Sequence, residues 1–170
     1  MKRFDAKRIS SLSLLCALAL LAYLLEGLFP PLFIPGAKLG ISNIFTLLAL
    51  VLFGGREALL TVLVKCLLGT VFGGNFSALM YALPASLIAL GAEYFLFRFV
   101  FPKISLVSVS VAAALLHSAV QNVVFALVIR SAYALVYLPY LCIVGAIAGV
   151  AVGFAVYLTV KILPEKFFEL

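Results

Sequence analysis

Polar side chains that could bind a solute stand inside or beside long apolar runs of this sequence. Such groups are costly within a membrane and usually face an interior cavity or a partner. We expect all of them in the outer half of the membrane or near its midplane, where they would line one pocket open to the exterior. The expected substrate-binding residues are Glu26, Lys38, Asn43, Asn75, His117, Gln121 and Asn122.

The densest part of this set is a short stretch of one apolar run. His117 and Gln121 are four residues apart, so they lie one above the other on a helix, and Ser118 with Asn122 forms the adjacent stripe. This face could hydrogen-bond a polar solute. It could also bond neighbouring helices, as polar side chains do in other membrane proteins, and both interpretations stay open.

Lys65 and Glu93 are two further ionisable residues within apolar runs. Lys65 follows Arg56 by nine residues, which is roughly 13 Å along a helix and places it near mid-bilayer. It could bind an anionic substrate group, pair with Glu93, or extend its ammonium toward one interface. Glu93 is expected nearer the cytoplasmic face, where a structural or partner contact is favoured over substrate binding.

The segment 34–45, IPGAKLGISNIF, separates two apolar runs. Pro35 stops a helix, and Gly36 with Gly40 permits backbone shapes that other residues resist. Ser42 or the preceding turn could then cap the next helix, whose amino end carries partial positive charge beside Lys38. The segment is either an anion-facing mouth or an ordinary outer loop whose lysine meets lipid headgroups.

The sequence has few residues for enzymatic chemistry. Asp5 is its single aspartate, whereas a magnesium-dependent phosphoryl or prenyl-diphosphate enzyme needs several carboxylates. There is no phosphate loop of the G-x-x-x-x-G-K type, so ATP hydrolysis by that route is excluded. His117 has no metal-site companions at suitable spacing. We therefore expect no catalytic activity, no cofactor and no metal.

The elements that must position these residues are membrane helices. Of 170 residues, 66% are hydrophobic and 11% charged, against roughly a quarter charged in ordinary soluble domains. The continuous apolar runs exclude alternating membrane strands. We expect an all-α, polytopic membrane protein with a single integral membrane domain over residues 1–170. Its six expected spans are 9–29, 41–53, 56–73, 76–100, 106–130 and 139–163.

The net charge of +6 is explained by membrane topology, with no nucleic acid as partner. Lysine and arginine accumulate at the cytoplasmic ends of membrane helices. The end that carries the termini has most of them, and the other end has only Lys38 and Arg130. We therefore expect a multi-pass protein of the cytoplasmic membrane with both termini in the cytoplasm.

Small residues at every fourth position mark close helix contacts in lipid. The last span offers Gly145, Gly149 and Gly153 in this register. This stripe predicts either packing within the bundle or contact with a partner helix.

Four stretches also carry a family resemblance: KLGISNIFTLLALVLFGGREALL, VFGGNFSALMYALPASLIAL, LLHSAVQNVVFALVI and YLPYLCIVGAIAGVAVG. Together they resemble the Gx transporter family, also labelled heptaprenyl diphosphate synthase component I. That family is similar to the S-components of energy-coupling-factor transporters, which are six-helix bundles. The resemblance implies a substrate-capturing component that takes a small micronutrient-like solute from outside and docks on a coupling protein bound to two ABC-type ATPases.

Two features qualify what the resemblance implies. S-components commonly carry an alanine pair on the first helix for docking, and the nearest match here is Ser13 and Ala17. The docking surface therefore differs, or the protein works without that partner. The family label also implies an alternative function, a noncatalytic membrane subunit or partner of a heptaprenyl (polyprenyl) diphosphate synthase in isoprenoid biosynthesis.

Overall fold

All regular structure in the described part of the chain is helical. The computed structural model describes residues 6–28 and 40–163. The expected all-α class is therefore confirmed for these ranges. The largest difference from the expected bounds is at the first helix, which begins at Ala6 instead of residue 9. The elements are α1 (Ala6–Leu28), α2 (Ser42–Leu52), α3 (Gly55–Gly73), α4 (Phe76–Phe99), α5 (Leu106–Val128), the 3₁₀ helix η1 (Ala132–Tyr137) and α6 (Leu138–Ile162).

Four helical segments of the described chain are long and apolar enough to cross a membrane: α1, α4, α5 and the continuous η1–α6 segment. They support a membrane-embedded protein. Two of the six expected spans, α2 and α3, are not among these four segments. With 11 residues, α2 is only about 16 Å long, whereas the hydrocarbon core is about 30 Å thick. The longer α3 carries Arg56, Glu57 and Lys65.

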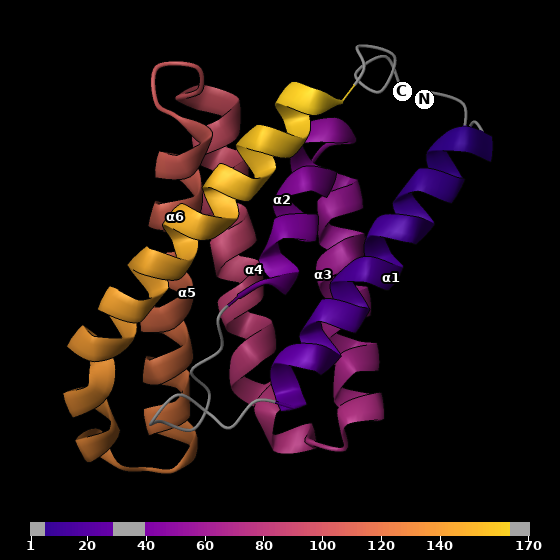
Figure 1. Ribbon diagram of the computed structural model, residues 1–170. Coiled ribbons are helices and arrows are strands. Elements are labelled where there is room, and N and C mark those ends of the chain that lie inside the picture. Colours follow the sequence, from indigo (N-terminus) through magenta and orange to yellow (C-terminus); the bar gives the residue numbers. More distant parts are fainter. Residues whose placement is uncertain (1–5, 29–39, 164–170) are drawn as a thin grey trace.

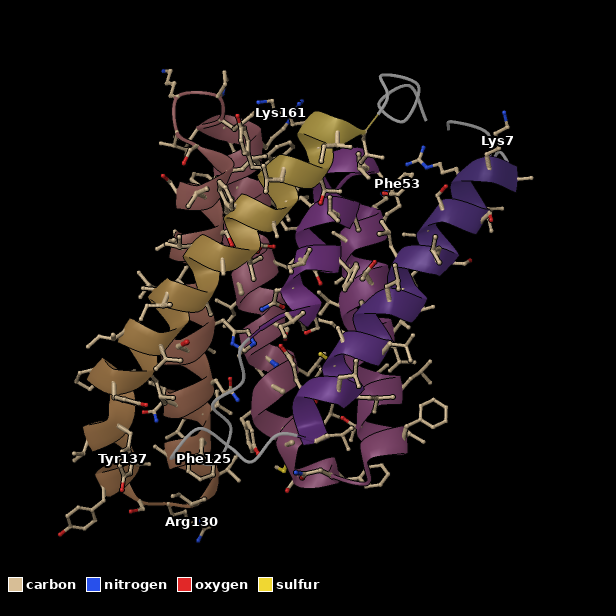
Figure 2. All side chains as sticks on the ribbon, viewed as in Figure 1. Lys7, Phe53, Phe125, Arg130, Tyr137 and Lys161 are labelled. Carbon is tan, nitrogen blue, oxygen red and sulfur yellow. The ribbon has the colours of Figure 1, made fainter. Side chains whose placement is uncertain are left out.

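The helices run roughly along one direction, and their ends collect at two ends of the molecule. The start of α1, the α2–α3 turn and the end of α6 lie together at the top of Figure 1. Lys7 and Lys161 lie at this end, whereas Arg130 and Tyr137 lie at the opposite end (Figure 2). The three labelled basic residues thus lie at the ends of the bundle where the sequence places them. The membrane side that each end faces stays a prediction.

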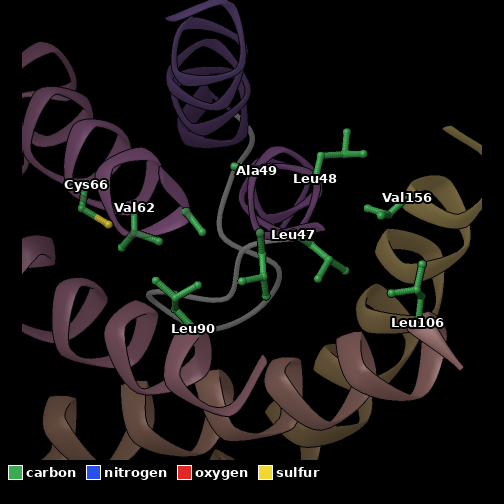
Figure 3. Packing of buried hydrophobic residues seen from close by; sticks show 10 residues of the cluster. Leu47, Leu48, Ala49, Val62, Cys66, Leu90, Leu106 and Val156 are labelled. Atoms are coloured by element: carbon green, nitrogen blue, oxygen red, sulfur yellow. The ribbon is translucent and has the colours of Figure 1, made fainter. Parts of the chain in front are cut away.

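The short helix α2 is enclosed by its neighbours on all sides. The consecutive residues Leu47, Leu48, Ala49 and Leu50 are at most 4% exposed. Successive helical residues point about 100° apart, so four in a row cover the whole circumference. Figure 3 shows α2 nearly end-on among the side chains that surround it. The buried cluster also contains, from α3, α4, α5 and α6 in turn, Val62, Leu90, Leu106 and Val156.

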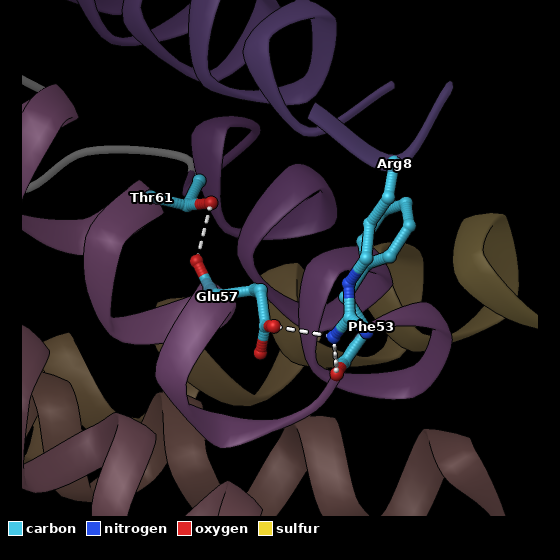
Figure 4. A network of polar contacts seen from close by, with 4 residues as sticks. All are labelled: Arg8, Phe53, Glu57 and Thr61. Carbon is cyan, nitrogen blue, oxygen red and sulfur yellow. Dashed lines mark hydrogen bonds and ion pairs between the residues drawn. The ribbon is translucent and has the colours of Figure 1, made fainter. Parts of the chain in front are cut away.

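Arg8 of α1 holds the turn between α2 and α3 (Figure 4). Its Nη2 atom donates a hydrogen bond of 3.0 Å to the Phe53 carbonyl oxygen and forms an ion pair with Glu57. The guanidinium also lies 5.9 Å from the centre of the Phe53 ring, within the range of a cation–π contact. The carboxyl end of α2 is therefore fixed to the first helix.

The glycine stripe of α6 packs against α5. A methyl group added at Gly149 would lie 2.8 Å from the Cα atom of Val111, and one added at Gly153 would lie 2.6 Å from the Cα atom of Val107. The two backbones are therefore too close for any side chain. Of the two alternatives open from the sequence, the structure selects packing within the bundle.

We predict that Gly149→Ala destabilises the protein by about 1 to 3 kcal/mol, because the added methyl group meets α5 backbone that cannot move aside. The measurement is thermal unfolding of the purified protein in detergent. Gly91→Ala is the matched control, since a methyl group there meets nothing within 4 Å. Equal melting temperatures for the two variants would contradict close α5–α6 packing.

Candidate functional site

A cavity of about 740 Å³ lies between the helices, and all six α-helices contribute to its wall. The size is typical of small-molecule sites, which range from about 300 to 1,000 Å³. Every expected binding residue that the structure describes lines it, whereas Lys38 falls outside the described residues. Their role in binding stays a prediction. The described members of the set are Glu26, Asn43, Asn75, His117, Gln121 and Asn122.

Lys65 of α3 connects the cavity wall to α2. Its side chain is 2% exposed, and its Nζ atom donates to Asn43 Oδ1 at 2.6 Å and to Thr46 Oγ1 at 2.9 Å. Asn43 and Thr46 are three residues apart, so they share one face of α2. Both partners are neutral. No ion pair joins Lys65 to Glu93 at contact distance, although the two side chains attract each other across the same cavity wall.

Glu26 of α1 caps the amino end of α2. Its carboxylate accepts a hydrogen bond from the Ile41 backbone N–H and another, at 3.5 Å, from the Ser42 hydroxyl. Of the two expected caps, the preceding turn contributes, because the Gly40 carbonyl oxygen accepts from the Asn43 N–H at 2.9 Å, whereas the Ser42 hydroxyl bonds to Glu26. A carboxylate suits this place because the first N–H groups of a helix lack partners and carry partial positive charge.

His117 and Asn122 both contact neighbouring elements as well as the cavity. A hydrogen bond of 3.3 Å joins His117 Nε2 to the Ser86 hydroxyl of α4. Asn122 Nδ2 donates to the Ala134 carbonyl oxygen of η1 at 3.1 Å. Both residues thus form hydrogen bonds to a neighbouring helix. They also line the cavity, so binding of a solute stays a prediction.

Asn75 has a local structural role at the cavity mouth. It is the amino cap of α4, where its Oδ1 atom accepts hydrogen bonds from Ala78 N at 3.1 Å and from Ser77 Oγ at 2.8 Å. The side chain is exposed. Gln121 also lines the cavity and is half-buried.

The sequence-based set omitted several polar residues of the wall. Lys65 and Glu93 were recognised as unusual but were not assigned to the site, and Thr46 and Ser86 were missed. The position of Thr46, one turn beyond Asn43, was the available signal. Ser86 continues the register of small residues Ala78 and Ala82 at every fourth position, a pattern that indicates helix packing and not a solute contact. Within the described residues, no group of His, Cys, Asp or Glu side chains could hold a metal ion.

A comparison with protein families gives one match. The model of the family described as heptaprenyl diphosphate synthase component I matches residues 15–159. The chain belongs to this family. The resemblance seen in the sequence is therefore confirmed, and the matched region contains the whole set of cavity residues named above. No curated protein and no solved structure matches the chain.

We predict that Glu26→Ala loosens the start of α2, because loss of a helix cap costs about 1 kcal/mol, or roughly fivefold in local opening. Hydrogen exchange followed by mass spectrometry should show faster exchange in peptides that cover residues 40–46. Peptides from the middle of α5 serve as the internal control. Unchanged exchange at the start of α2 would contradict the cap.

Proposed function

We propose that this protein is a membrane transport protein, the substrate-capturing component of an energy-coupling-factor type uptake system for a small micronutrient-like solute. The observation that carries the proposal is the cavity of about 740 Å³ between the helices. Its wall is largely apolar and includes a few charged and amide side chains, the composition typical of small-molecule sites.

The position of α2 supports the same proposal. This helix begins at Ser42, well inside the bundle, and its first turn lines the cavity (Figure 1). Interrupted helices that begin beside a central site recur in membrane transporters, where the positive amino end favours acidic groups of the substrate. Lys65 adds a basic hydrogen-bond donor at the same place.

The proposal includes a topology and partners. We place all six α-helices in the cytoplasmic membrane with both termini in the cytoplasm, so that α2 and α3 complete a six-helix bundle. The basic end shown by Lys7 and Lys161 (Figure 2) would then face the cytoplasm. The partners would be a membrane coupling protein and ABC-type ATPases, which supply the energy.

A second candidate function rests on the family description. The words heptaprenyl diphosphate synthase component I favour a noncatalytic membrane subunit or partner of a heptaprenyl diphosphate synthase. In that case the chain would hold the catalytic subunit at the membrane, near its lipid product. The polar wall of the cavity would then have no direct part in the reaction.

We predict ligand-dependent thermal stabilisation of the purified protein in a screen of vitamins, their precursors and isoprenoid compounds. A ligand at 100 times its dissociation constant adds about 2.7 kcal/mol of stability. Ala82→Phe fills the cavity and should abolish the effect. Ile88→Phe, on the exposed face of the same helix, should preserve it. Stabilisation that survives Ala82→Phe in a correctly folded variant would argue against a site in this cavity.

Affinity purification from native membranes separates the two candidates. The first predicts recovery of a coupling protein and ATPases, and the second predicts recovery of a prenyl diphosphate synthase subunit. Recovery of the synthase alone, together with no stabilising ligand in the screen, would overturn the transport proposal. Recovery of the coupling protein and ATPases without synthase would overturn the second.

A further inference from the structure

Two side chains of opposite charge line the cavity and attract each other without forming a contact ion pair. Lys65 is 2% exposed and Glu93 is 6% exposed. Among the described residues, the ion pair found in the structure joins Arg8 to Glu57, away from this cavity. Burying a charge is costly unless a partner or a hydrogen bond compensates it. A ligand in the cavity could therefore lower the cost of burying both charged groups.

Lys65 is only partly satisfied by the protein. An ammonium group has three N–H donors, and hydrogen bonds to Asn43 and Thr46 use two of them. Both acceptors are neutral oxygens, so they orient the ammonium without neutralising its charge. One donor therefore remains for a group within the cavity.

Glu93 has fewer hydrogen-bond partners in the protein than Lys65. No hydrogen bond or ion pair from the described residues reaches its carboxylate, although the residue is almost fully buried in the wall. Glu26 differs, because its carboxylate serves the first turn of α2. Glu93 is thus the acidic group of the wall that is left for a donor on a ligand.

Asn122 has a buried acceptor without a partner. Its Nδ2 atom is bonded to Ala134, but its buried Oδ1 atom has no hydrogen-bond partner. That atom is closed to the open cavity, so the groups that the described wall offers to a ligand include the Lys65 donor and the Glu93 carboxylate. A ligand with only an acidic or phosphate group would satisfy the first and leave the carboxylate buried alone.

We propose that the ligand of this cavity carries both an acidic group and an amino or ring N–H group. Lys65 binds the acidic group, and Glu93 binds the amino or N–H group. The inference rests on the proposed function and names its substrate class: zwitterionic or aminated acidic solutes. Long purely apolar chains with an anionic head lie outside this class.

The test uses matched probes on the purified full-length protein in lipid nanodiscs. Aminohexanoate and aminooctanoate carry both groups, the corresponding alkanoates lack the amine, and the corresponding alkylamines lack the acid. Dissociation constants come from titrations of thermal stability. We expect the better amino acid probe to bind at least about tenfold more tightly than either of its single-group counterparts, the gain typical of one charge-assisted hydrogen bond.

Glu93→Gln keeps the shape of the side chain and removes its charge. It should weaken binding of the amino acid probe about tenfold, leave the alkanoate unchanged, and leave the melting temperature without ligand unchanged or higher. Glu57→Gln is the matched control, because it makes the same change outside this cavity. It should not alter the preference for the amino acid probe.

Either of two results with the unmodified protein overturns the inference. One is equal binding of the amino acid probe and the alkanoate to the unmodified protein, and the other is no binding of either amino acid probe. A loss of thermal stability in Glu93→Gln with unchanged probe preference would also contradict it, because that result assigns Glu93 a structural role. In each case the solute screen decides the proposed function independently. A ligand that Ala82→Phe excludes supports the proposed function, and a screen without any ligand contradicts it.

Discussion

The ammonium of Lys65 fixes the place at which α2 begins, and much of the described structure depends on that contact. A lysine at 2% exposure is stable only if oxygen atoms surround its charge. Asn43 and Thr46 supply those oxygens from the first turns of α2. Glu26 holds the same helix end from the other side by accepting from Ile41 and Ser42. Side chains from α1 and α3 therefore position a helix that is too short to cross a membrane.

The rest of the bundle encloses this short helix. Its consecutive buried residues contact neighbours on every side (Figure 3), and Arg8 fixes its carboxyl end to α1. On the far side, the glycines of α6 let that helix approach the backbone of α5 closely. Both ends of α2 are thus held while its first turn remains beside a polar cavity. The same contacts that stabilise the fold set the positions of the groups that could meet a solute.

Much of this arrangement could be predicted from the sequence. Continuous apolar runs divided by glycine, proline and charged residues indicated helices close to the observed bounds, because helix length and polarity are local properties of the chain. The polar residues of those runs were expected to converge, and their described members do line one cavity. This convergence follows from the cost of exposing polar groups to lipid. The individual partners could not be predicted, because spacing along one helix does not specify which neighbouring helix it meets.

The sequence by itself determined the all-α class, the apolar lengths of the helices, the separation of basic residues between the two ends, and the membership of the family. Only the tertiary structure decided which helices meet. It showed that Glu26 binds the start of α2 and that the glycine stripe of α6 packs against α5. It also showed that Lys65 donates to Asn43 and Thr46 without a contact ion pair to a described acidic residue. The physical reason is that each of these contacts joins helices far apart in the chain. Their geometry depends on how whole helices pack, which local pattern does not encode.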